Sequence, residues 1–502
     1  MRGGAVMSDL PVATEVAIAT RHPLGLRTLF FTEMWERFSY YGMRALLVLF
    51  MVRQTASGGM GLNDEVATAI YGLYTAGVYL MALPGGWIAD RICGAQRTVW
   101  YGGIIIALGH FTLALPWTQT FYCGLVLVVV GSGILKPNMS TLVGELYPEG
   151  GARRDAGFTI FYMGVNLGAA LGPLACCYLA QCLGWHWGFA AAGIGMVLGL
   201  GQFRWTRHLL GNAGAALPDR QRVGRVGIGV MVGAVAAVLG SIGLIFAGII
   251  VVYPPAVARF ASLGIVLIAA AYFAHVLLLR GLDVLEQRRV WLILVLFLAA
   301  ALFWAGFEQA GSSFNLFAER YTEREIGTGG FVIPAGWFQS LGAVFVIALA
   351  PVMAALWVAL ARNMWNPSIP MKFGFGLLFL ALGFGVMAAA AGFVAAGKQV
   401  MPVWLVATYL IHTIGELCLS PVGLSSVSKL APRKLAGQMM GLWFLASALG
   451  NLLAGLLAGA LTSDGIQHWP LMYLKIAVFP VAAGLLLIAF SKRLAGLAPD
   501  VR

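Results

Sequence analysis

Long apolar stretches alternate along the chain with short segments rich in charge, glycine and proline. A helix of about 20 apolar residues spans the hydrocarbon core of a bilayer. The pattern predicts fourteen such helices, near residues 28–53, 66–90, 97–116, 121–146, 157–182, 187–207, 225–252, 256–279, 289–317, 331–360, 372–396, 402–428, 435–462 and 468–490. The sequence therefore predicts an all-α integral membrane protein with no soluble domain.

The composition excludes most soluble classes of protein. Hydrophobic residues make up 60% of the chain and charged residues only 10%, whereas a soluble protein carries about 25% charged residues. The six cysteines lie in or beside apolar segments, and none has a Cys-x-x-Cys spacing. We therefore expect reduced, buried thiols, with neither a disulfide framework nor a metal site.

The distribution of lysine and arginine sets the expected orientation. The formal net charge is +12. If the N-terminus is cytoplasmic, the outer loops hold few basic residues, namely Arg53, Arg259, Arg320, Arg324 and Lys398. Because cytoplasmic loops carry the excess of Lys and Arg, both termini are expected in the cytoplasm. The basic excess then reflects topology, and no nucleic-acid partner is expected.

A basic loop near 208–224 suggests two halves joined by an extra pair of helices. The segment GGWIADRICGAQR, at 85–97, resembles the loop motif of the major facilitator superfamily. The resemblance implies a major facilitator fold. We expect an N-terminal six-helix bundle at 28–207, a linker with two extra helices at 208–286, and a C-terminal six-helix bundle at 287–491.

The first predicted helix concentrates charged and phenolic side chains that are costly in a membrane. They are Glu33, Glu36, Arg37, Tyr40, Tyr41 and Arg44. Steps of three and four residues place most of them on one stripe. The stripe is consistent with a structural cluster of ion pairs, but a path for protons or substrate is the interpretation we favour.

Other predicted helices carry isolated polar groups. Lys136 lies beside Pro137, and Asn166 and Trp443 lie on two further helices. Trp304 and Glu308 share one face of their helix, and another helix carries His412, Glu416 and Ser420 on one face. The alternatives without a role in transport are a lysine that extends to the membrane surface, an asparagine that hydrogen-bonds between helices, and a histidine or tryptophans that only pack. Glu308 and Glu416 lie in the middle of their helices, where an inert carboxylate is not expected.

Polar groups drawn from both halves fit a central cavity at the bilayer midplane. Arginine and lysine bind carboxylates, and a glutamate binds an ammonium group. Arg37 or Lys136 would therefore hold the carboxylate of a zwitterion and Glu416 its amine. Asn166 and the tyrosines would hydrogen-bond an amide between them.

The motif EMWERFSYYG in the first helix resembles the ExxERFxYYG motif of the proton-dependent oligopeptide transporter family. Further resemblances follow in order along the chain: LKPN (135–138), FYMGVNLGA (161–169), FEQAGSS (307–313), PAGWFQSL (334–341) and GELCLSPVGLS (415–425). Bacterial members of this family have fourteen helices, which agrees with the count from the hydrophobic pattern.

The resemblance implies a role for each matching residue. It implies proton coupling by Glu33, Glu36, Arg37 and Glu308, and a gate salt bridge among Arg44, Lys136 and Glu308. It implies substrate binding by Arg37, Tyr40, Tyr41, Tyr79, Lys136, Asn166, Trp304, Glu416, Ser420 and Trp443. One position departs from the family pattern, because Gly342 stands where the family usually places an asparagine that helps to bind the peptide amine.

The expected function is a proton-coupled symporter that imports di- and tripeptides by alternating access. The alternative is another small substrate on the same scaffold, such as nitrate or an amino-acid-like or drug-like compound. An enzyme is not expected, because HExxH, GxSxG and phosphate-loop motifs are absent from the sequence. A channel is not expected either. We expect a monomer in the bacterial plasma (inner) membrane, with protons as coupling ion and no cofactor.

Overall fold

The computed structural model describes residues 22–215, 229, 233, 240–241, 243–245, 247–327, 330–363, 366–463 and 465–499. The first helices are α2 (Gly25–Val52), α3 (Asp64–Ile88), α4 (Ala95–Leu113), α5 (Thr118–Glu145), α6 (Gly151–Leu183) and α7 (Trp185–Thr206). After α9 (Pro254–Leu279) come α10 (Val284–Phe307), α11 (Ser313–Tyr321), α12 (Phe338–Arg362), α13 (Ile369–Ala395), α14 (Val403–Leu430), α15 (Ala436–Ser463), α16 (Trp469–Ala489) and α17 (Ser491–Ala495). Strands β1 (Glu325–Ile326) and β2 (Phe331–Val332) pair as a short antiparallel hairpin.

The all-α membrane fold predicted from the sequence is confirmed. Ten helices within the described residues are long and apolar enough to cross a membrane. All but one of the predicted spans coincide with helices of the structure; the exception, 225–252, lies largely outside the described residues. The chain is therefore a multi-pass membrane protein.

Two predicted spans differ in detail from the helices of the structure. The span 289–317 is interrupted, because α10 ends at Phe307 and a 3₁₀ turn covers Glu308–Gly311 before α11 begins. At the end of this turn Ser312 leaves the helical region, with φ −122° and ψ −94°. The span 331–360 starts late, since Phe331 and Val332 pair in β2 and α12 begins only at Phe338.

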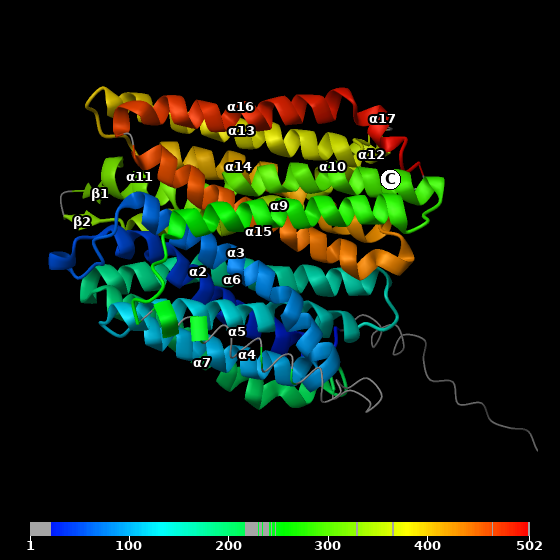
Figure 1. Cartoon of the computed structure of the whole chain (residues 1–502), viewed down its shortest axis with the longest axis horizontal. Helices are drawn as coiled ribbons and strands as arrows, with labels where there is room; N and C mark the ends of the chain where they lie inside the picture. Colours follow the sequence, from blue (N-terminus) through cyan, green and yellow to red (C-terminus); the bar gives the residue numbers. More distant parts are fainter. Residues whose placement is uncertain are drawn as a thin grey trace, which may run out of the picture.

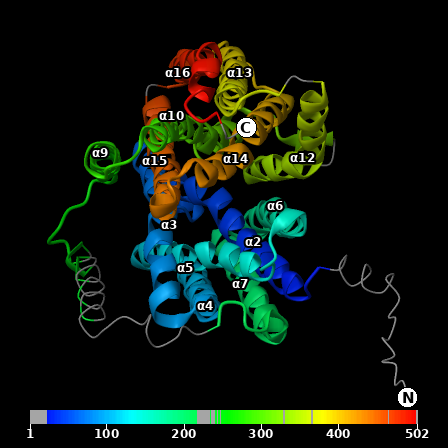
Figure 2. The ribbon, with the colours of Figure 1, turned by 90° about the vertical axis from the view of Figure 1, so that its right-hand side faces the viewer.

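The helices run side by side between two ends of the molecule (Figure 1). We call the end with the β1–β2 hairpin the hairpin face and the end near the C-terminus the terminal face. Seen end-on, α2–α7 form one group and α10–α16 another (Figure 2). The groups meet where α3 packs along α15 and where α6 packs against α12. At the first seam a Cβ on Gly72 would lie 3.2 Å from the Gly455 Cα, so small residues permit the close approach.

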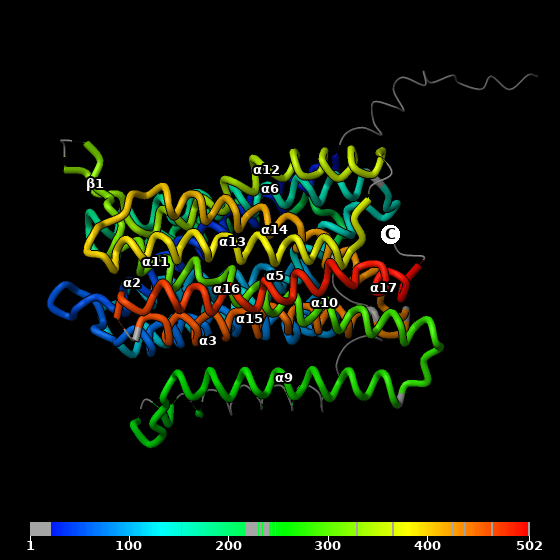
Figure 3. Tube along the Cα trace, turned by 90° about the horizontal axis from the view of Figure 1, so that it is seen from above, coloured from blue at the N-terminus to red at the C-terminus, as the bar shows by residue number. Residues whose placement is uncertain are grey.

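Helix α9 stands apart from the body of the molecule (Figure 3). It touches both groups, because it packs against α3 and α15. Arg259 Nη2 lies 3.4 Å from Glu65 Oε1 at the start of α3, and the Tyr272 hydroxyl donates to Gln438 Oε1 of α15 at 2.5 Å. The helix therefore lies across the seam between the two groups.

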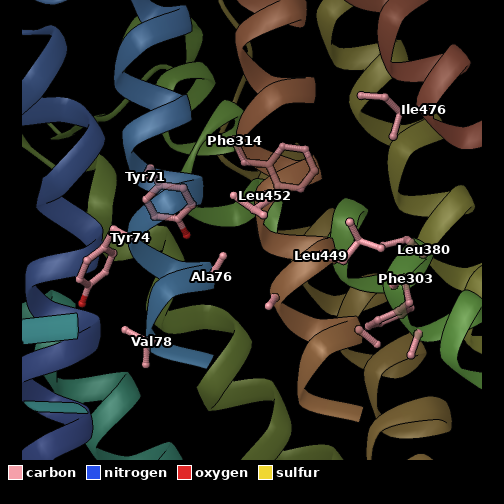
Figure 4. Close-up of a cluster of buried hydrophobic side chains, with 14 of the residues drawn as sticks. Tyr71, Tyr74, Ala76, Val78, Phe303, Phe314, Leu380, Leu449, Leu452 and Ile476 are labelled. Atoms are coloured by element: carbon pink, nitrogen blue, oxygen red, sulfur yellow. The ribbon is translucent and has the colours of Figure 1, made fainter. Parts of the chain in front are cut away.

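Apolar side chains fill the seam between α3 and the second group (Figure 4). Tyr71 of α3 faces Leu452 of α15 and Phe314 of α11, all of them buried. The same cluster continues to Phe303 of α10 and Leu380 of α13. This continuous packing positions the polar groups of α2, α3 and α10 next to one another.

The crossing of α2 and α6 depends on Gly168. A Cβ at this position would overlap the Met34 carbonyl oxygen and lie 2.8 Å from the Arg37 Cβ. Since backbone atoms cannot move aside, we expect Gly168→Val to destabilise the fold by about 3 kcal/mol, the upper end for overpacked cores. Thermal unfolding of the purified protein measures the effect. Gly392→Val is the matched control, because a Cβ at Gly392 meets nothing within 4 Å; equal melting temperatures for both variants would contradict the prediction.

Candidate functional site

A buried charge cluster lies within α2, where steps of three or four residues bring its members onto one face. Arg37 Nε donates to Glu33 Oε1 at 2.8 Å and lies 3.1 Å from Glu36 Oε2. The three residues are 6% exposed or less. One guanidinium thus faces two carboxylates, so the cluster holds more negative than positive charge within α2.

Lys136 approaches this cluster from α5. Its Nζ lies 4.0 Å from the centre of the Tyr79 ring, a cation–π contact. The sequence predicted that Lys136 shares Glu308 with Arg44. The structure instead pairs Glu308 with Arg44, and Lys136 makes no ion pair with any residue that the structure describes.

An ion pair joins the two groups of helices at their centre. Arg44 Nη2 of α2 lies 2.5 Å from Glu308 Oε2 in the 3₁₀ turn after α10. Arg44 Nε also donates to the Tyr71 hydroxyl at 2.6 Å. The two charged residues are only 7% and 4% exposed. Removing one partner of such a buried pair costs about 3–5 kcal/mol, because the other charge stays buried.

Sequence reasoning missed the partnership of Tyr71. A signal for it exists at Gly311, where a Cβ would overlap the Tyr71 hydroxyl. Glycine at this point of the FEQAGSS motif lets α3 approach the broken helix closely enough for the tyrosine to reach Arg44. The contact between distant segments could not be read from either segment alone.

A cavity of about 120 Å³ lies between the two groups, next to the Arg44–Glu308 pair. It is lined by Tyr41, Arg44, Tyr79, Asn166, Ala169, Trp304, Phe307, Glu308, Ala310, Gln339, Gly342, Ala343, Val346, Tyr409, His412 and Glu416. The structure thus brings together nine residues that the sequence singled out: Tyr41, Arg44, Tyr79, Asn166, Trp304, Glu308, Gly342, His412 and Glu416. Gln339 and Tyr409 were missed, and no charge marks them in the sequence.

Other predicted site residues lie outside the cavity lining. Glu33, Glu36, Arg37 and Lys136 form the neighbouring cluster, which Tyr79 connects to the cavity. Tyr40 is buried and stacks on Tyr74 with 6.1 Å between ring centres. Trp443 is buried against Phe373, and Ser420 is half-buried one turn beyond Glu416. His412 lies at the cavity edge, where its Nε2 is 3.0 Å from the Leu380 carbonyl oxygen.

The hairpin face is held together by a second set of polar contacts between the groups. Arg320 of α11 forms two hydrogen bonds of 2.6 and 2.7 Å to the Asp64 carboxylate at the start of α3. Three neutral bonds run from the second group to backbone carbonyls of the first: Asn315 to Ala45 at 2.9 Å, Trp337 to Leu174 at 2.9 Å, and Ser340 to Ala170 at 2.7 Å. On this side of the cavity the groups are therefore closed against each other.

Comparison with known proteins identifies the family in which this arrangement occurs. The model of the POT family matches residues 96–468. The peptide transporter YePEPT of Yersinia enterocolitica is 44% identical over 491 residues, which cover 93% of each chain. A crystal structure of a variant of peptide transporter POT with alafosfalin has a TM-score of 0.86 at 39% identity, covering 95% of this chain and 96% of the other. A POT family transporter crystallised with 5-aminolevulinic acid has a TM-score of 0.85 at 32% identity, covering 94% and 97%.

These matches span most of the chain and both of its helix groups. They agree with the six sequence motifs, which include the charge cluster, Glu308 of the ion pair and part of the cavity lining. Members of the matched family are transporters, and no enzymatic activity is expected of this fold. The chain belongs to the POT family and has the major facilitator fold.

Proposed function

We propose that this protein is a proton-coupled symporter that imports di- and tripeptides by alternating access. The observation that carries the proposal is the buried Arg44–Glu308 pair, which joins the two helix groups at the wall of the cavity. A titratable carboxylate in this place can link protonation to the movement of the groups. The peptide transporters among the relatives support peptides as the substrate class.

The cavity has the chemistry that a peptide needs. Glu416 lines it and makes no ion pair with any described residue, so it can receive an ammonium group. Asn166 lines it too, and the cations of the adjacent cluster, Arg37 and Lys136, would attract the carboxylate. A relative crystallised with 5-aminolevulinic acid holds a ligand that combines an amine with a carboxylic acid. Two carboxylates in one small cavity disfavour a simple anion such as nitrate.

Protonation of Glu308 would release Arg44. The neutral acid no longer attracts the guanidinium, and a peptide carboxylate would compete for the freed cation. Proton and peptide then favour the same change of state, which is the requirement for symport. Glu33 and Glu36 would supply or relay the proton from the neighbouring cluster.

The proposed setting is the bacterial inner membrane with both termini in the cytoplasm. The hairpin face is then periplasmic, and the structure represents a state closed toward the periplasm. We propose that the bundles 28–207 and 287–491 rock about the central site, while the linker 208–286 supplies the extra helices. The protein would act as a monomer with no cofactor other than the coupling proton.

Uptake of labelled dialanine into proteoliposomes tests the proposal. An imposed inward proton gradient should drive accumulation, and unlabelled di- and tripeptides should compete for it. Each proton supplies about 2.3 kcal/mol per 100 mV and about 1.4 kcal/mol per pH unit. If internal dialanine never exceeds the external concentration, with or without the gradient, the proposed proton coupling is wrong. If no di- or tripeptide competes with dialanine, the proposed substrate class is wrong.

The ion pair at the hairpin face should matter much less than the central one. Arg320 and Asp64 retain 34% and 17% side-chain exposure, and a partly exposed pair contributes about 0–1 kcal/mol. We therefore expect Asp64→Asn to change the initial rate of driven dialanine uptake by less than about fivefold. A rate reduced more than about 100-fold, with normal expression, would show that this pair is an essential gate.

A further inference from the structure

One wall of the cavity is formed by a stripe of α12. Gln339, Gly342, Ala343 and Val346 line the cavity at steps of three and four residues. Helix α12 packs against α6, which carries Asn166, and against α14, which carries Glu416. The stripe therefore belongs to the end of the cavity where the proposed function places the amine of a peptide.

Two hydrogen-bond donors of the cavity lining, one on α10 and one on this wall, have no hydrogen-bond partner among the residues that the structure describes. They are the indole Nε1 of Trp304 and the amide Nε2 of Gln339, and both atoms are buried. Trp304 is held in place, because its ring packs edge-on against Phe303 and Phe307 at 5.6 and 5.5 Å. Buried donors are normally satisfied. Two neutral N–H groups without acceptors at the wall of one cavity thus indicate that an acceptor comes from the ligand.

The wall also has room for that acceptor. A Cβ on Gly342 would meet nothing within 4 Å, although the residue lies between Gln339 and Val346 on the cavity stripe. The open position adds space to the cavity one turn along α12 from Gln339. A larger residue there would occupy the space that the ligand could use.

The charged residues of the cavity limit which hydrogen-bond acceptor of a ligand can bind at the wall. Glu308 and Glu416 line the same cavity, so a carboxylate on the ligand at this end would be repelled. A cation would leave both donors unsatisfied. We infer that the α12 wall is a subsite for a neutral amide oxygen near the amino end of the substrate, an inference that rests on the proposed peptide transport. Because Asn166 and the tyrosines are expected to bind the peptide bond that every dipeptide has, this oxygen comes from an Asn or Gln side chain in the first residue or from the additional backbone amide of a tripeptide.

Competition against labelled dialanine for the purified full-length protein tests the subsite. Asn-Ala and Leu-Ala have first side chains of similar shape, and only the first has an amide. We expect Asn-Ala to bind about tenfold more tightly than Leu-Ala, the effect of one or two satisfied neutral donors. Asp-Ala should bind more weakly than Asn-Ala. Trialanine against dialanine tests the backbone amide as the source.

Gln339→Met removes a donor and keeps the length of the side chain. We expect it to reduce the Asn-Ala preference, the trialanine preference, or both to under about threefold, each measured relative to dialanine on the same variant. Which preference falls identifies the source of the oxygen. Gly342→Leu should weaken the same ligand by at least about tenfold more than it weakens dialanine, and an unchanged melting temperature reports correct folding.

Three outcomes overturn the subsite. If the wild type shows neither preference, or if both variants leave the preferences unchanged, the subsite is wrong while peptide transport stands. If the wild type binds no di- or tripeptide, the proposed function fails and the subsite fails with it.

Discussion

Glu308→Gln should abolish proton-driven uptake of dialanine while peptide exchange across the membrane continues. Glutamine has nearly the shape of glutamate but cannot titrate, so the link between protonation and the Arg44 contact is lost. It also imitates the protonated acid, which leaves the Arg44 guanidinium free for the peptide carboxylate in every cycle. Binding and movement of the empty and loaded carrier therefore persist.

The size of the effect follows from the driving force. A proton that carries about 2 kcal/mol sustains an accumulation of roughly 30-fold. In the variant we expect the ratio of internal to external dialanine to fall to about one. Driven uptake and counterflow into preloaded vesicles, measured on the same preparation, separate loss of coupling from loss of transport.

Glu319→Gln is the matched control for this change. Glu319 lies on α11, pairs with Arg324 at 2.8 Å and is 32% exposed on its side chain, so its charge is screened by solvent. The control should retain driven accumulation. Full accumulation by Glu308→Gln, or its loss in both variants, would show that the central ion pair is not the coupling element.

Glu416→Gln should weaken the binding of dialanine by at least about 30-fold. The carboxylate lines the cavity and has no ion pair among the described residues, so a bound ammonium would be its charge partner. Removing one partner of a buried, hydrogen-bonded charge pair costs about 2–5 kcal/mol. Equilibrium binding to the purified variant measures the loss.

Acetylated dialanine provides the internal control, because it has no ammonium group. Its affinity should be low in the wild type and should change by less than about threefold in Glu416→Gln. Equal losses for the free and the acetylated peptide would instead assign Glu416 a structural role in the cavity wall.

The fold could be predicted because the bilayer imposes a strong pattern. Helices must satisfy their own backbone groups in lipid, so long apolar stretches identify them almost without regard to context. The pattern fails at the helix break: the polar stretch at the 3₁₀ turn Glu308–Gly311 is too short to divide the apolar span in two. Glycines and a polar motif were visible there, but their consequence depends on α3 packing against the turn.

The candidate site was predictable as far as charge reveals it. A carboxylate such as Glu308 or Glu416 is costly in the middle of a membrane helix, so its presence alone indicates a function. Gln339 and Tyr409 carry no such signal, since amides and phenols also occur at packing positions. The ion-pair partner of a charged residue is harder to predict from the sequence. Both Arg44 and Lys136 were predicted partners of Glu308, and the structure shows the ion pair with Arg44.

The most direct test of proton-coupled peptide symport is the voltage at which the dialanine-induced current in reconstituted membranes reverses. Dialanine is a neutral zwitterion, so coupled protons carry the current. We predict that the reversal voltage shifts when either the pH gradient or the dialanine gradient is changed at fixed values of the other. A reversal voltage that follows only one gradient, or a dialanine flux without current, would contradict the coupling.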